Sequence, residues 1–230
     1  MARGGHAGVF LGGIALLAAC GLDDRLLLVA DAAGSDGAAG VHQLLLGTFE
    51  QGTLLPDDPR FERWEFGAVP PGGEAGSGTF AAEAIVAPGY RSAHAVQLDW
   101  QVTDTADGQP NYPGVLLSTG TGSIDLSGYA RLVFAQRYQH QGSCRAVPLL
   151  TVMLVCRELK SAFLSFAGMS SDWTPESVDF GNLQEATGVG VLREICLKQI
   201  DHVYFSALVS LADGECASGT LSLDEIAIQM

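Results

Sequence analysis

From Val41 to the end of the chain, hydrophobic and polar residues alternate with a period of two, and glycine, proline, aspartate or serine punctuates the pattern. Such alternation is typical of strands with one buried and one exposed face. Only 192–199 has helical spacing, with Leu192, Ile195 and Cys196 on one side. Strands are predicted over 44–49, 63–66, 79–85, 95–102, 114–117, 131–138, 149–155, 161–166, 177–180, 202–209 and 220–228.

This set of strands predicts an all-β fold. A mostly antiparallel set of this size must stack as two sheets or close as a barrel, because open sheet edges are liable to aggregate. We expect a jelly-roll β-sandwich of two antiparallel sheets, formed by residues 41–230 as one domain.

Two of the predicted strands carry candidate binding residues. The alternation within 95–102 and within 202–209 directs apolar side chains to the core and polar ones outward. We expect both strands, together with 149–155, to be neighbours in one sheet. Amides, carboxylates, hydroxyls and a tyrosine ring can bond to and stack on a sugar. The predicted ligand-binding residues are Gln97, Asp99, Gln101, Tyr204 and Ser206, unless these are ordinary solvated strand positions.

The first twenty residues resemble an export signal. Arg3 is the only arginine, lysine or acidic residue before an apolar run over 7–19, which is too short to span a bilayer. The run ends Leu17-Ala-Ala-Cys20-Gly, which resembles the lipobox of bacterial lipoproteins. The resemblance implies lipidation of Cys20 and, because glycine rather than aspartate follows, anchoring at the outer membrane or cell surface. An ordinary secretory signal with an adjoining cysteine is the alternative.

The segment after the lipobox is small, polar and acidic. It includes Asp31-Ala-Ala-Gly-Ser-Asp-Gly-Ala-Ala-Gly40, which has too little apolar surface to offset the entropy of ordering it. The sequence therefore predicts a signal peptide over 1–19, and a lipidated cysteine with a flexible tether over 20–40.

Composition and motifs argue against several classes of function. Twelve Lys and Arg residues against 26 Asp and Glu residues give a net charge of -14, which disfavours nucleic acid as a partner. The histidines lack the spacing of a zinc site, and no nucleophile elbow, phosphate loop or complete dinucleotide fingerprint is present. We expect no enzymatic activity, although a carboxylate pair assembled from distant strands would be invisible in a sequence.

The cysteines suit an oxidising compartment. If lipid occupies Cys20, four cysteines remain, which is an even number. Cys144 and Cys156 flank one predicted strand, and Cys196 and Cys216 flank another. Bonded cysteines need Cα atoms within about 7 Å, whereas a seven-residue strand spans about 23 Å. If the two strands are antiparallel neighbours, the bonds are Cys156–Cys196 and Cys144–Cys216. We prefer this pairing to the other two; free thiols are the alternative.

Several segments, in the same order, resemble the galactose-binding-like β-sandwich of carbohydrate-binding modules. They are Asp125-Leu-Ser-Gly-Tyr-Ala-Arg-Leu-Val-Phe134, Asp172-Trp-Thr174, Ile200-Asp-His-Val-Tyr-Phe205 and Gly219-Thr-Leu-Ser-Leu-Asp-Glu-Ile226. Phe49-Glu50 ahead of Trp64 resembles the opening of these modules. The resemblance covers about 44–228 and implies a non-catalytic jelly-roll domain that binds carbohydrate.

The same resemblance implies a structural calcium ion. In such modules a carboxylate after the first strand and an aspartate in the last strand hold the ion. Glu50 and Asp224 occupy the matching positions, and backbone carbonyls could complete the six to eight oxygens that calcium takes. A solvated glutamate and an aspartate that caps a strand are the alternative.

The sequence thus predicts an exported, lipid-anchored surface protein that binds a polysaccharide or glycan without chemistry. A structural or adhesion lipoprotein that binds an envelope protein is the alternative. A jelly-roll glycoside hydrolase or lyase is a third hypothesis.

Overall fold

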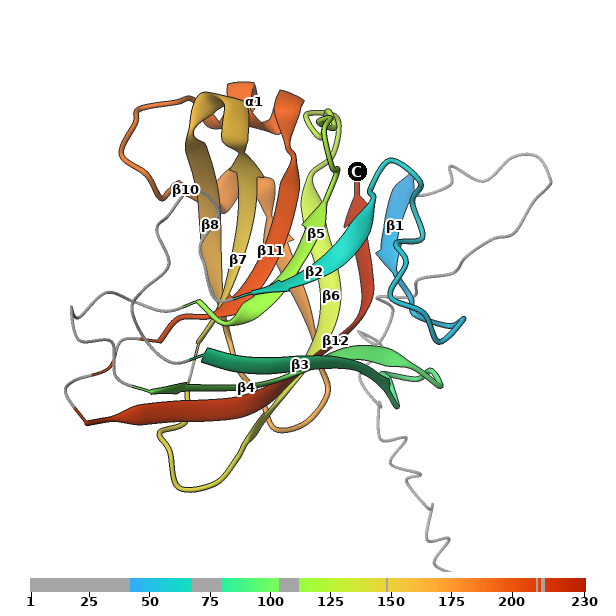
Figure 1. Cartoon of the computed structure of the whole chain (residues 1–230). Coiled ribbons are helices and arrows are strands. Elements are labelled where there is room, and N and C mark those ends of the chain that lie inside the picture. Colours follow the sequence, from blue (N-terminus) through green and yellow to red (C-terminus); the bar gives the residue numbers. More distant parts are fainter. Residues whose placement is uncertain (1–41, 68–79, 104–111, 148, 210, 212–213) are drawn as a thin grey trace, which may run out of the picture. The chain divides into compact units, whose positions relative to one another are not determined.

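The computed structural model describes residues 42–67, 80–103, 112–147, 149–209, 211 and 214–230. The described chain forms two antiparallel sheets joined mostly by turns and loops (Figure 1). Predictions for the signal peptide, Cys20 and the tether lie outside these residues. Within the described part, no helix is long and apolar enough to cross a membrane.

Sheet A is built around the long C-terminal strand. Its order is β3 (Phe80–Ala87), β4 (Ala95–Thr103), β12 (Cys216–Gln229), β6 (Arg131–His140) and β9 (Thr174–Asp179), and β1 (Gln43–Gly47) also pairs with β12. β4 pairs with the first half of β12 and β1 with its last residues. A register shift between Asp224 and Ala227, with Glu225 at a φ of 48°, separates the two halves. Such bulges bend a strand and increase its twist.

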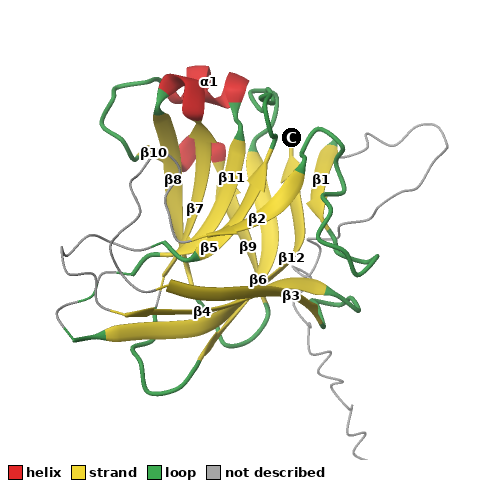
Figure 2. Cartoon of the chain, viewed as in Figure 1, coloured by secondary structure: helices red, strands yellow, loops and turns green. Residues whose placement is uncertain are grey.

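Sheet B packs against sheet A. Its order is β10 (Gln184–Glu185), β8 (Ser161–Gly168), β7 (Leu149–Cys156), β11 (His202–Ala207), β5 (Gly114–Ser118) and β2 (Arg63–Gly67). The short helical segments are η1 (Arg157–Leu159), η2 (Phe180–Asn182), α1 (Arg193–Cys196) and η3 (Leu197–Gln199). Figure 2 shows α1 at the end of β7 and β8.

One hydrophobic core joins the two sheets. Phe134 of β6 meets Phe205 of β11 edge to face, with ring centroids 5.1 Å apart. The predicted inward side chains all belong to this core: Val96, Leu98, Trp100 and Val102 on β4, and Val203, Phe205 and Ala207 on β11. The period-two pattern therefore identified the side chains that face the main core on both strands.

The predicted all-β sandwich is confirmed, with small shifts at the element ends. β9 begins at Thr174, three residues before the predicted start, and the two-residue β10 was not predicted. The predicted helix over 192–199 is shorter, because one turn of α-helix passes into the 3-10 turn η3.

Both preferred disulfides are present. Cys156 bonds to Cys196, with Cα atoms 5.5 Å apart, and Cys144 bonds to Cys216, with Cα atoms 5.0 Å apart. The premise also holds, because β7 and β11 are antiparallel neighbours.

One predicted adjacency is wrong. β4 does not lie beside β7 and β11, because it pairs with β3 and β12 in the other sheet. The alternation of residues fixes which face of a strand is buried, but it does not fix which strand is the neighbour. The outward residues of β4 and β11 therefore belong to different sheets.

Candidate functional site

A polar surface covers the side of sheet A that faces away from the core. Residues directly opposite each other on paired strands share one face, and the register aligns Asp99 with Thr220 and Gln139, and Gln97 with Ser222 and Arg137. We call this surface the polar face, and its members are Gln97, Asp99 and Gln101 of β4, Ser218, Thr220 and Ser222 of β12, and Arg137 and Gln139 of β6.

Asp99 is the centre of a hydrogen-bond network on the polar face. Thr220 Oγ1 donates to Asp99 Oδ1 at 2.5 Å, and Gln141 Nε2 donates to the same oxygen at 3.4 Å. Gln97 Nε2 lies 3.4 Å from Asp99 Oδ2, and Gln141 Nε2 also bonds to Thr220 Oγ1. These donors fix the carboxylate before any ligand arrives, which lowers the entropic cost of binding.

Two aromatic side chains lie at one edge of the polar face. Trp173 immediately precedes β9, which pairs with β6 so that Thr174 lies opposite Gln136. Tyr90 comes from the loop between β3 and β4, and its ring centroid is 6.1 Å from that of Trp173. Both rings are half-buried. Rings of this kind can stack against the apolar face of a sugar.

Arg137 lies over the Trp173 ring, with Cζ 4.9 Å from its centroid. Among the described residues the guanidinium has no carboxylate partner, and its Nε is buried without a hydrogen bond. The hydroxyl of Ser222, opposite Arg137 on β12, is likewise buried without a partner in the described part. Buried polar groups are normally hydrogen-bonded. Eight buried side-chain atoms in the described part have no partner, and only these two belong to the polar face, where a ligand could supply one.

A carboxylate pair lies further along β12. Asp224 is fully buried, and its Oδ2 accepts hydrogen bonds from Tyr90 N at 2.8 Å and Ser92 Oγ at 2.7 Å. Burial raises the pKa of Asp224 to about 6, and the charge of Glu50 adds to the rise. Burial and the neighbouring Asp224 raise the pKa of Glu225 to about 7, against the opposing charge of Arg91.

The predicted calcium ligands, Glu50 and Asp224, lie close enough for the charge of Glu50 to raise the pKa of Asp224. No three His, Cys, Asp or Glu side chains in the described part lie close enough together to hold a metal ion. Asp224 already accepts three hydrogen bonds, the third from Glu225 N at 2.8 Å. Glu50 adds negative charge beside these hydrogen bonds. Calcium binding stays a prediction.

Tyr204 and Ser206 lie elsewhere, on the outer side of sheet B. Tyr204 is only 1% exposed and packs in a second apolar cluster with Met153 and Val155, and its hydroxyl donates to the carbonyl of Tyr112. Ser206 is fully buried. The prediction that both share a solvent-facing surface with β4 is therefore wrong, because an outward position on a strand can still be covered.

The structure thus brings Gln97, Asp99 and Gln101 together and separates them from Tyr204 and Ser206. The alternation of residues does not single out Arg137, Trp173 or Tyr90 as binding residues. Trp173 could have been found from the sequence if the strand had been predicted to begin at Thr174 instead of Ser177. Pairing of that longer strand with β6 would have put Trp173 beside Arg137.

The two antiparallel sheets form a β-sandwich that resembles solved carbohydrate-binding modules in fold. No family model matches the sequence, and no curated protein matches it. The family 11 carbohydrate-binding module of the cellulosomal cellulase Lic26A-Cel5E of Clostridium thermocellum is similar over 83% of this chain and 95% of its own, with a TM-score of 0.52 and 15% identity.

A second solved structure is the family 11 module from Clostridium thermocellum in complex with a β-1,3-1,4-mixed-linked tetrasaccharide. It is 15% identical, with a TM-score of 0.51, over 83% of this chain and 96% of its own. Similarity at this level of identity establishes a shared fold.

Proposed function

We propose that this chain is a non-catalytic carbohydrate-binding protein and that the polar face of sheet A is its binding surface. The observation that carries the proposal is the pair of unpartnered groups, Arg137 Nε and the Ser222 hydroxyl, beside the Trp173 ring. The carbohydrate-binding modules that share the fold support the same conclusion.

The chemistry of the surface matches a sugar. Asp99 accepts hydrogen bonds from hydroxyl groups, Gln97 and Gln101 both donate and accept them, and Arg137 donates several in a planar array. Trp173 and Tyr90 lie at the edge of the same surface. The guanidinium of Arg137 covers one face of Trp173 and that of Arg91 covers one face of Tyr90, so a sugar would stack on the opposite faces. A polysaccharide or glycan presents hydroxyl edges and apolar ring faces in alternation, so it can use both kinds of contact.

We further propose that the protein is exported and held by lipid on Cys20 at the outer membrane or cell surface. The lipobox-like sequence supports this. So do the two disulfides, because disulfides persist in oxidising compartments outside the cytosol.

A glycan and polysaccharide panel tests the binding proposal, with the full chain, its Asp99→Ala, Trp173→Ala and Arg137→Ala variants, and one control variant. Asp99→Ala and Trp173→Ala should each weaken binding of a selective ligand at least tenfold, which is about 1.4 kcal/mol. Arg63→Ala is the matched control for Arg137→Ala, since Arg63 is an exposed arginine on sheet B. Melting temperatures of all variants separate loss of binding from loss of fold.

The panel can also refute the proposal. A selective ligand that binds equally to wild type and to the Asp99, Arg137 and Trp173 variants would place the binding surface elsewhere. A panel with no ligand would favour an envelope protein as the partner.

A further inference from the structure

The end of the sandwich at α1 displays a concentrated group of aliphatic side chains. Val189 is 57% exposed, Leu192 63% and Ile195 46%, all within seven residues of one another. We call these three residues the α1 patch. Single exposed apolar residues are ordinary, whereas a cluster of them indicates a contact surface.

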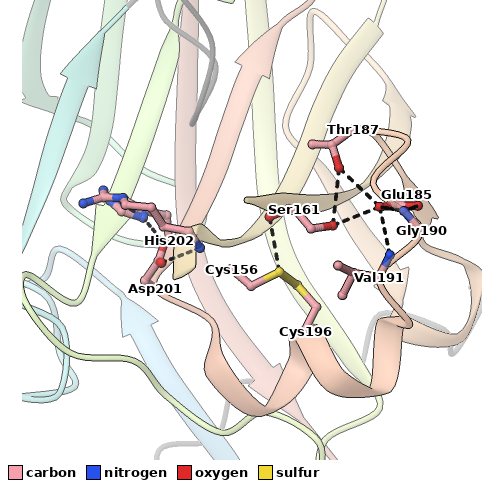
Figure 3. Close-up of a disulfide and its surroundings, with 10 residues drawn as sticks. Cys156, Ser161, Glu185, Thr187, Gly190, Val191, Cys196, Asp201 and His202 are labelled. Carbon is pink, nitrogen blue, oxygen red and sulfur yellow. Dashed lines mark hydrogen bonds and ion pairs between the residues drawn. A yellow bond between two sulfur atoms is a disulfide. The ribbon is translucent and has the colours of Figure 1, made fainter. Parts of the chain in front are cut away.

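The α1 patch is held in place rather than loosely attached. The Glu185 carboxylate accepts hydrogen bonds from Gly190 N at 3.0 Å and Val191 N at 3.3 Å, and from the hydroxyls of Ser161 and Thr187 at 3.2 Å (Figure 3). Partial burial opposes ionisation, but these bonds keep the pKa of Glu185 below its ordinary value.

The disulfide secures the other side of the patch. Cys196, the last residue of α1, is bonded to Cys156 at the end of β7 (Figure 3). The segment that carries Val189 and Leu192 is therefore fastened at both ends, by the Glu185 carboxylate and by the disulfide. A surface fixed in this way loses little conformational entropy on contact with a partner.

The described chain begins at this same end. Leu126 N donates to Leu197 O at 2.7 Å, Ala130 N donates to Gln229 O at 2.8 Å, and Met230 N donates to His42 O at 3.2 Å. This series of backbone contacts leads from η3, beside α1, to the first described residue. Whatever attaches to the chain before His42 therefore joins the domain at the end that carries the α1 patch.

The only two lysines of the chain lie at this end of the sandwich. Lys160 follows η1, which contacts β8, and Lys198 lies in η3, which contacts α1. Both are exposed. Lysine stems can lie along an apolar surface while the ammonium group stays in water. Glu158 and Glu194 lie among them, so this end is not strongly basic, and contact here depends on the aliphatic groups rather than on anionic headgroups.

We infer that the α1 patch rests in the interface of the phospholipid bilayer to which the chain is anchored. The inference depends on the proposed lipid on Cys20. A bilayer is favoured over a protein partner because the tether that leads back to Cys20 joins the domain at this end. The contact would orient the polar face away from the lipid, since Thr220 lies nine residues before Gln229 on β12, a distance along the strand of about 30 Å.

Fluorescence quenching in vesicles tests this inference. The full chain, purified from membranes, would carry Leu192→Trp and be reconstituted into phosphatidylcholine vesicles with brominated acyl chains. Phe166→Trp is the matched control, because Phe166 is 48% exposed on the opposite half of β8. After subtraction of the wild-type signal, we expect at least twofold quenching for the Leu192 variant and none for the control. Mass spectrometry of each preparation reports lipidation.

The outcomes separate the inference from its premise. A lipidated Leu192→Trp protein that is quenched no more than the control overturns docking and leaves the anchor in place. A protein without lipid overturns the anchor and docking together. A third outcome would indicate a protein partner. In that case the tryptophan emission of the Leu192 variant shifts to the blue in whole envelopes but is not quenched in vesicles. That result overturns the proposal that the bilayer covers the patch. A second test combines Leu192→Asp with Ile195→Trp in one protein. Leu192→Asp should not change the melting temperature, but it should abolish quenching of the tryptophan at position 195.

Discussion

The paired carboxylates on β12 make stability depend on pH in an unusual direction. The pKa of Asp224 is raised from 3.8 to about 6 and that of Glu225 from 4.5 to about 7, mainly by burial. A carboxyl group with a raised pKa binds its proton more tightly in the folded than in the unfolded state. Its contribution is therefore fully present below about pH 4 and is lost as the pH rises through 6 and 7.

The size of the effect follows from these values. A rise of one in a pKa corresponds to about 1.4 kcal/mol, so each group alone would contribute at most about 3 kcal/mol. Glu225 is only half-buried, and the repulsion between Asp224 and Glu225 is shared rather than counted twice. With solvent screening, we expect the pair to cost about 2 to 3 kcal/mol of unfolding free energy between about pH 4 and pH 7.5.

Urea unfolding across that pH range measures this cost. The measurements are made in the presence of a chelator. As the pH rises, the unfolding free energy of the wild type should fall by about 1 to 2 kcal/mol more than that of Glu225→Gln. The reason is that the variant lacks one titrating group and one charge beside Asp224. Asp125→Asn is the control of opposite sign, since hydrogen bonds from Ser127 lower the pKa of Asp125. The reasoning is refuted if the difference in unfolding free energy between the wild type and Glu225→Gln stays constant with pH. It is also refuted if that difference increases in favour of the wild type as the pH rises.

Two further predictions concern Glu50 and Tyr204. If calcium binds beside Glu50 and Asp224, the melting temperature of the wild type at about pH 7.5 should be higher with calcium than with a chelator. The melting temperature of Glu50→Gln should not change. Equal melting curves for the wild type would refute the predicted calcium site. Tyr204→Ala should cost about 3 kcal/mol or more in urea unfolding, because it truncates a buried aromatic side chain. Unchanged stability would show that Tyr204 is not packed as observed.

The sequence was sufficient to predict the sandwich, because alternation in β4 and β11 identifies the side chains that face the main core. It also predicted both disulfides, since the four cysteines sit at the ends of two strands that pair. Strand order was harder to predict. β12 pairs on one edge first with β4 and then with β1, and the break at Glu225 that permits this is a backbone feature with no pattern of residue types behind it.

The candidate site was only partly predictable for the same reason. Gln97, Asp99 and Gln101 share one strand, so alternation alone groups them. Their partners Thr220, Arg137 and Trp173 come from three other parts of the chain, and only the register of sheet A brings them together. Tyr204 was misjudged because alternation reports which side of a sheet a residue occupies and says nothing of a second layer outside it.

The polar face divides into two parts with different consequences for binding. Around Asp99 the donors and acceptors already satisfy one another, so a ligand there must compete with existing hydrogen bonds. Around Arg137 and Ser222 the groups are buried and unpaired, and an unsatisfied buried polar group costs about 1 to 3 kcal/mol. A ligand hydroxyl that displaces the atoms covering these groups and bonds to both removes that cost on binding. Affinity should therefore depend more on the half of the face beside Trp173, and orientation more on the half beside Asp99.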